Sequence, residues 1–192
     1  MSAFNDIIES VVTQVRAEYD PTNGKRPFWF FGYFKELLLI LAEKDQSNTY
    51  KFDKYPLIAL LTGYKTIEND ASDEVSNITI LIIKETDINS RTKNRIVANY
   101  EPVLRPLKVL LKKYIKRSKN LTSDNMYSWE VEEFPYWGDD PRGANVGNDA
   151  LDAIVITGLE LRVNRCLTLP AYRVTEASIQ RITENGNLRI VS

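Results

Sequence analysis

Two residue types that often carry catalysis, histidine and cysteine, are absent or nearly absent from this sequence. It contains no histidine, which is the usual proton shuttle near neutral pH and the commonest metal ligand. Ser-His-Asp and Cys-His mechanisms, zinc hydrolase sites and histidine-based oxygenase sites are therefore excluded. Cys166 is the only cysteine, so no intrachain disulfide can form. Because a nucleophile needs an activating base, we interpret Cys166 as a small apolar residue.

Acids in the segment 129–142 are the one group that could perform acid-base chemistry. Asp139 and Asp140, with Glu132 and Glu133 shortly before them, could form a carboxylate pair or an oxygen site for a hard cation. A solvated turn is the simpler interpretation, because paired acids beside glycine and proline are common in turns. The sequence also lacks both glycine-rich phosphate-binding signatures. We therefore expect no cofactor, no metal and no enzymatic activity, with a carboxylate enzyme kept as an alternative.

Positive charge is concentrated on one face of a helix predicted at 101–118. The basic side chains recur at three- and four-residue steps and include Arg105, Lys108, Lys112 and Lys116. Such a face could contact a phosphate backbone or an acidic partner, although a solvated face is the more common outcome. The whole chain has a net charge of −1 and therefore offers no general basic field to nucleic acid.

Aromatic residues form a second candidate interface. The segment 28–34 is rich in aromatic residues, and alternation cannot bury all of them in one small domain. A further group lies in the segment 120–149 and consists of Trp129, Phe134, Tyr136 and Trp137. Exposed aromatic residues mark interfaces more often than catalytic sites, so we expect some of these rings to contact another chain.

Hydrophobic periodicity predicts the elements that position these residues. Helices are expected at 3–19, 36–44 and 101–118, and strands at 28–34, 55–62, 78–84 and 150–165. Polar or irregular loops are expected at 45–53, 68–77 and 120–149, followed by a short helix at 175–182 and a short strand at 188–191. This order predicts an α+β fold.

Apolar side chains of the long strand are expected on one face. Alternation would direct Leu151, Val155, Leu159 and Leu161 toward the helix 101–118. We expect one domain at 1–165, with 120–149 as an inserted loop and 166–192 as a C-terminal extension or arm.

A soluble, intracellular protein is expected from the composition. About 43% of the 192 residues are apolar and 27% are charged, which suits a domain with its own core. The most apolar stretch, 28–42, is interrupted by Lys35 and Glu36 and is too short to span a bilayer. The first six residues also lack the basic-then-apolar pattern of a signal peptide.

The order of elements resembles the tail-terminator and tail-completion proteins of long-tailed bacteriophages, with related neck proteins. The residues that carry the resemblance are helix 3–19, the strand opening at 54–60 (KYPLIAL), its neighbour 78–82 (ITILI), Asn94-Arg95 ahead of helix 101–118, and the closing strand from Ile154 to Leu161. Together they span residues 1–118 and 149–165.

The resemblance implies a small, mainly antiparallel sheet flanked by two helices, without enzymatic activity. It also implies a homo-oligomeric ring, typically of six copies, that caps the tail tube and joins it to the head connector. Its partners would be further copies of itself, tail-tube proteins and portal-side connector proteins, with DNA passing through the ring and no membrane contact. Its place would be the neck or tail of a virion assembled in the cytoplasm of a bacterial host.

Two features exceed the minimal fold of that family. The segments 120–149 and 166–192 are longer than the fold needs, and in a ring subunit they would suit contacts to neighbouring copies or stacked rings. Two alternatives to the virion interpretation stay open. One is a non-viral intracellular protein-interaction module, and the other is an enzyme with a carboxylate site in the 129–142 loop.

Overall fold

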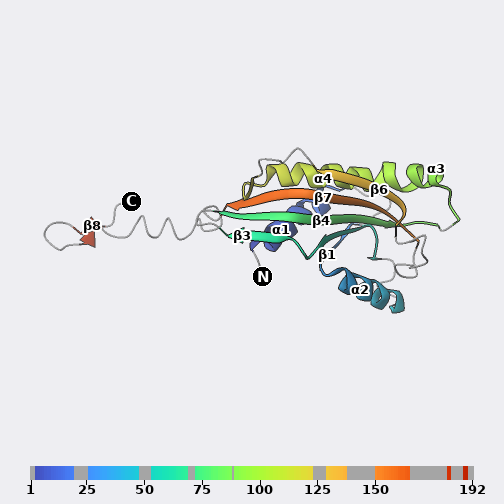
Figure 1. Cartoon of the computed structure of the whole chain (residues 1–192), viewed down its shortest axis with the longest axis horizontal. Helices are drawn as coiled ribbons and strands as arrows, with labels where there is room; N and C mark the ends of the chain where they lie inside the picture. Colours follow the sequence, from blue (N-terminus) through green and yellow to red (C-terminus); the bar gives the residue numbers. More distant parts are fainter. Residues whose placement is uncertain are drawn as a thin grey trace.

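The computed structural model describes residues 3–19, 26–47, 53–68, 72–87, 89–122, 129–137, 150–164, 181–182 and 188–189. Its helical segments are α1 (Ala3–Glu18), α2 (Phe34–Gln46), α3 (Thr92–Arg95), the π-helix η2 (Ile96–Leu104) and α4 (Arg105–Arg117). Its strands are β1 (Phe28–Gly32), β2 (Leu57–Leu61), β3 (Lys65–Glu68), β4 (Ser72–Glu85), β5 (Leu121–Thr122), β6 (Glu130–Trp137), β7 (Leu151–Asn164), β8 (Arg181–Ile182) and β9 (Leu188–Arg189). The expected α+β class is confirmed (Figure 1).

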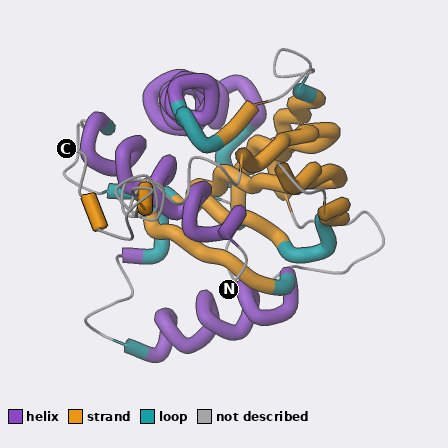
Figure 2. Tube along the Cα trace, turned by 90° about the vertical axis from the view of Figure 1, so that its left-hand side faces the viewer, coloured by secondary structure: helices purple, strands orange, loops and turns teal. Residues whose placement is uncertain are grey.

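Seven of these strands form one mixed sheet. Its main path is β1-β2-β4-β7-β5, with β3 added beside β4 and β6 added beside β7. Every pair is antiparallel except β1 with β2. In Figure 2 helical turns lie above and below the strands. The sheet is therefore mainly antiparallel, as expected, but it is covered by helices on both faces.

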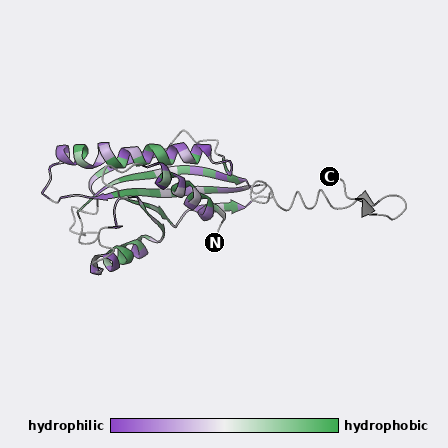
Figure 3. Ribbon diagram, turned by 180° about the vertical axis from the view of Figure 1, so that it is seen from behind, coloured by the Kyte–Doolittle hydropathy of each residue, from purple (hydrophilic) through white to green (hydrophobic). Residues whose placement is uncertain are grey.

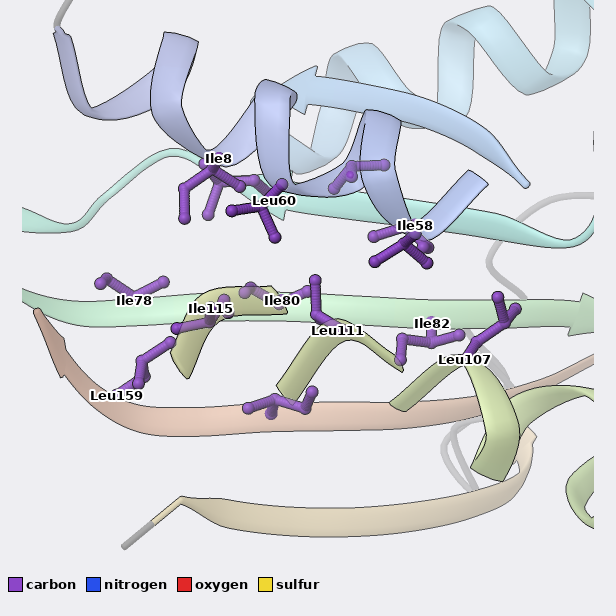
Figure 4. Close-up of a cluster of buried hydrophobic side chains, with 14 of the residues drawn as sticks. Ile8, Ile58, Leu60, Ile78, Ile80, Ile82, Leu107, Leu111, Ile115 and Leu159 are labelled. Carbon is purple, nitrogen blue, oxygen red and sulfur yellow. The ribbon is translucent and has the colours of Figure 1, made fainter. Parts of the chain in front are cut away.

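The first face of the sheet packs against α1, η2 and α4. In α1 the apolar residues recur at helical spacing, so one side of the helix is buried against the sheet. Figure 4 shows side chains from both layers meeting in this core: Ile8 of α1, Leu107, Leu111 and Ile115 of α4, and Ile58, Leu60, Ile78, Ile80, Ile82 and Leu159 of the sheet. Burial of each such side chain stabilises the fold by about 1.5–3 kcal/mol.

The second face of the sheet packs against α2. Among the described side chains of this helix, only Leu37 and Leu41 are buried, and they contact a smaller core that contains Phe30, Leu57 and Leu151. Figure 3 shows hydrophobic and hydrophilic residues mixed along α2. Helix α2 is therefore held by one row of side chains, and part of its apolar surface stays exposed.

The strand β7 does not keep one face toward the helices along its length. Leu159 and Leu161 pack in the first core with α4, as expected, but Leu151 and Val155 lie in the second core with α2. The prediction that all four share one face was therefore wrong. The cause is a β-bulge at Gly158, whose φ is +67°, where one extra residue reverses the inward and outward positions.

Two segments that were expected to be loops contain strands, and one helix begins earlier than expected. The polar segment 68–77 contributes Ser72–Asn77 to β4, which forms a hairpin with β3. All four residues of β3 are exposed, so the sequence has no alternating apolar pattern that would predict this strand. The helix expected at 101–118 begins already at Thr92, as α3 and η2. The segment 120–149 contains β5 and β6 instead of loop alone.

The remaining expectations concern the C-terminal residues. Arg181 and Ile182 form β8, which pairs with β9, instead of ending a helix. Leu188 and Arg189 form β9 within the strand expected at 188–191. The other residues of the expected helix lie outside the described residues, as do Asp139, Asp140 and Cys166.

Candidate interaction surfaces

A buried ion pair fixes the helical layer to the sheet. Arg95 of α3 donates through Nη1 to Oδ1 of Asp152 on β7 at 3.0 Å, and both side chains are 0% exposed. Asn99 of η2 donates to the other carboxylate oxygen at 2.6 Å. Arg95 also donates to the carbonyls of Ser90 and Asp87, at 2.8 and 2.9 Å. These charges are hydrogen-bonded on several sides, which is the condition under which a buried pair can be tolerated.

Tyr136 connects the outer strand β6 to this cluster. Its ring centroid lies 3.2 Å from Cζ of Arg95, and its hydroxyl donates to the carbonyl of Ser90 at 2.6 Å. Its backbone N–H donates to Oδ1 of Asp152 at 3.4 Å. The ring is half-buried, so this candidate interface residue has a structural role inside the chain.

Tyr100 holds η2 against the same stretch of β7. Its hydroxyl donates to the carbonyl of Ala153 at 3.3 Å, and its side chain is buried. Burial raises the pKa of Tyr100 well above its usual value, and the negative charges of Asp152 and Glu133 raise it further. Tyr100 is therefore a neutral hydrogen-bond donor, and its position reinforces the contact between η2 and β7.

The basic face of α4 is partly neutralised within the chain. Arg105 binds Glu133 of β6 with two hydrogen bonds of 2.9 Å, and these bonds lower the pKa of the Glu133 carboxyl. Lys113 forms an ion pair with Glu18 of α1. Lys116 is exposed and Lys108 is half-buried. The four candidate basic residues therefore lie on one helix, but they do not form a uniform cationic surface.

Lys112 and Trp129 form a contact between α4 and the start of β6. Nζ of Lys112 lies 5.3 Å from the ring centroid of Trp129, a cation–π distance. Trp129 is half-buried and packs against the first core. The candidate residues Arg105, Lys112 and Trp129 thus join α4 to the edge of the sheet.

Two other aromatic candidates lie farther along β6. Phe134 is 38% exposed, and Trp137 packs against the second core. Trp137 also meets Phe34, at the start of α2, edge to face with ring centroids 5.7 Å apart. Tyr33, immediately before α2, is 64% exposed. Among the four aromatic candidates, Phe134 is the one classed as exposed.

The acids proposed for catalysis do not form a pair in the described part of the chain. Glu132 and Glu133 are successive residues of β6, so their side chains point to opposite faces of the sheet. Glu133 is bound by Arg105. Within the described residues, no group of three or more His, Cys, Asp or Glu side chains could hold a metal ion. No described helix is long and apolar enough to cross a membrane.

Sequence reasoning missed two residues of this part of the sheet, the buried Asp152 on β7 and the exposed Val131 on β6. Asp152 is a lone charge in the apolar run 151–156, and that anomaly was the available signal for a buried partner. Val131 of β6 is 39% exposed. The sequence did not indicate it as a candidate interface residue, because the acids around it hide the pattern of a strand.

The outermost strands of the sheet are β1 and β3 on one side and β5 and β6 on the other. Among the described residues, no strand pairs with the outer edge of any of these four. β1 and β6 both carry apolar side chains that are half-buried or exposed. The sheet thus has a different open edge on each flank, formed in part by β1 on one side and by β6 on the other.

No protein-family model matches this chain, and no curated protein matches it.

Proposed function

We propose that this chain is a structural subunit of a bacteriophage neck or tail. In this proposal, copies assemble into a ring that caps the tail tube and joins it to the head connector. The assignment to a phage is supported by the order of elements, which resembles tail-terminator and tail-completion proteins. The observation that carries the self-assembly is the pair of open edges, β1 and β6, on opposite flanks of one sheet.

An open edge can accept a strand from another chain. An unpaired strand presents a row of free N–H and C=O groups, and proteins normally cover, shorten or charge such edges. Here the two edges differ in sequence, so a contact between them is head-to-tail. Head-to-tail contacts close into rings when the rotation between copies divides a full turn.

DNA contact is the part of this proposal that rests on α4. A ring that spans the passage between head and tail would expose some surface to the DNA inside it. Lys108 and Lys116 lie on the basic face, and Lys116 is exposed. Any binding by this face is expected to weaken steeply with salt, because phosphate contacts release counterions.

The test of the proposal is the mass of the purified full-length chain in solution. Light scattering across concentrations, with negative-stain images of the same samples, should show closed rings of about six copies. Because a ring can need a template, the same measurement is repeated after mixing the chain with candidate tail-tube and connector proteins. The proposal would be contradicted if the chain remained a monomer at all concentrations and bound neither protein.

A further inference from the structure

We propose that copies of this chain join by strand addition, with β6 of one copy pairing antiparallel to β1 of the next. The contact would extend the mixed sheet from subunit to subunit. This inference rests on the self-assembly in the proposed function and identifies the surfaces that carry it.

The backbone of β1 is oriented for such a contact. The N–H of Phe28 donates to the carbonyl of Pro56, and the carbonyl of Gly32 accepts from Thr62, so both residues face β2. Because residues of a strand alternate in direction, Trp29 and Phe31 direct their N–H and C=O groups to the outer edge. These groups need partners when another chain covers them.

Strand directions make the new pair antiparallel. β1 and β2 run in one direction, β4 in the opposite direction, β7 in the first direction again, and β6 in the opposite one. A neighbour related by a rotation about an axis parallel to the strands keeps these directions. Its β1 therefore runs opposite to β6, which gives the slightly more stable type of ladder.

Side-chain chemistry matches on both faces of the joined edges. On the first face, Val131 of β6 would meet Trp29 and Phe31, which are half-buried and pack beside α1. On the second face, Phe134 would meet Phe28, since both lie on the side of α2. Apolar side chains that are partly exposed in one copy would thus cover each other.

Charge also favours this partner. Glu130 and Glu132 make the β6 edge acidic and are exposed on the side of α2. Beside β1, Arg26 is exposed, and Nζ of Lys44 lies 4.1 Å from the centroid of the Phe28 ring. Such pairing steers the acidic edge toward β1 and disfavours contact between two β6 edges.

Cysteine crosslinking tests the geometry directly. Cys166 is replaced by Ser, and Phe28→Cys is combined with Glu132→Cys or with Phe134→Cys, which represent two registers. In an antiparallel pair, residues that do not exchange hydrogen bonds have Cα atoms about 4.5 Å apart, within the range of a disulfide. After oxidation, denaturing gels without reductant should show a ladder of covalent multimers for one of these pairs. Each single cysteine variant is the control and should give at most a dimer.

The outcomes separate this inference from the proposed function. A ladder supports edge pairing. Oligomers in light scattering without a ladder from either pair would overturn edge pairing and leave the ring intact. A chain that is monomeric and gives no ladder would overturn both, because self-assembly itself would then fail.

A charge substitution provides a second, independent measurement. Val131→Lys with Phe134→Lys should raise the concentration needed for half-assembly about tenfold or more, since edge lysines block strand addition. Val109→Lys is the matched control, because Val109 is 61% exposed on α4 and lies outside both edges. Circular dichroism checks that all variants fold. Equal assembly of the edge variant and the control would contradict the inference.

Discussion

At the scale of single residues, the ion pair of Arg95 and Asp152 controls the stability of the region that carries β6. Arg95→Met leaves the Asp152 carboxylate buried without its cation, while the carbonyls of Ser90 and Asp87 lose a donor. We expect the free energy of unfolding to fall by about 3–5 kcal/mol. Urea denaturation of the full-length chain measures this change.

The control for Arg95 is an ion pair of the same kind at the surface. Arg162 donates to Glu74 at 2.9 Å, with side chains 42% and 44% exposed. Arg162→Met should cost less than about 1 kcal/mol, because solvent screens exposed pairs. Equal losses for Arg95→Met and Arg162→Met would show that burial does not amplify the first pair.

At the scale of elements, the bulge in β7 decides which core each residue joins. Leu159 is buried beside α4, whereas Val155 is half-buried on the opposite face. Leu159→Ala should lower the free energy of unfolding by about 2–5 kcal/mol, since it leaves a cavity in the larger core. Val155→Ala should cost about 1 kcal/mol or less, because part of its side chain already contacts solvent. Thermal or urea unfolding distinguishes the two, and equal losses would contradict the assigned faces.

The same bulge shows how far the sequence can predict this fold. Long elements with clear periodicity were predictable, because α1, α4 and β7 each bury a repeated apolar pattern. The reversal at Gly158 was not predictable. A single inserted residue exchanges the two faces of the strand but leaves its amino-acid composition unchanged. β6 was also missed, because it gains order by pairing with β7 and not by an alternating pattern of its own.

The candidate site was predictable only in part for a similar reason. Sequence spacing placed Arg105, Lys108, Lys112 and Lys116 on one helix, and the structure agrees. It could not show that Glu133 binds Arg105 or that Tyr136 stacks on Arg95, because these pairs join segments far apart in the chain. Because of these contacts, residues such as Tyr136 that were expected at an interface instead bind other parts of the same chain.

At the scale of the whole molecule, assembly by edge pairing should protect the edges of the sheet and leave its centre unchanged. β4 and β7 are paired on both sides for most of their length, so their amides should exchange slowly in the monomer and in the assembly. Trp29 and Phe31 of β1, and the outward-facing amides of β6, should exchange quickly in the monomer and slowly in the assembly. Hydrogen exchange of dilute and assembled samples measures this difference.

The exposed side of α4 is the internal control for that experiment. The amides of α4 are bonded within the helix, so edge pairing should leave their exchange unchanged. New protection confined to α4, with no change in β1 or β6, would mean that copies meet through the helical layer. Protection of β1 and β6 together is the specific signature of strand addition, because a contact at only one edge would slow exchange in one strand alone.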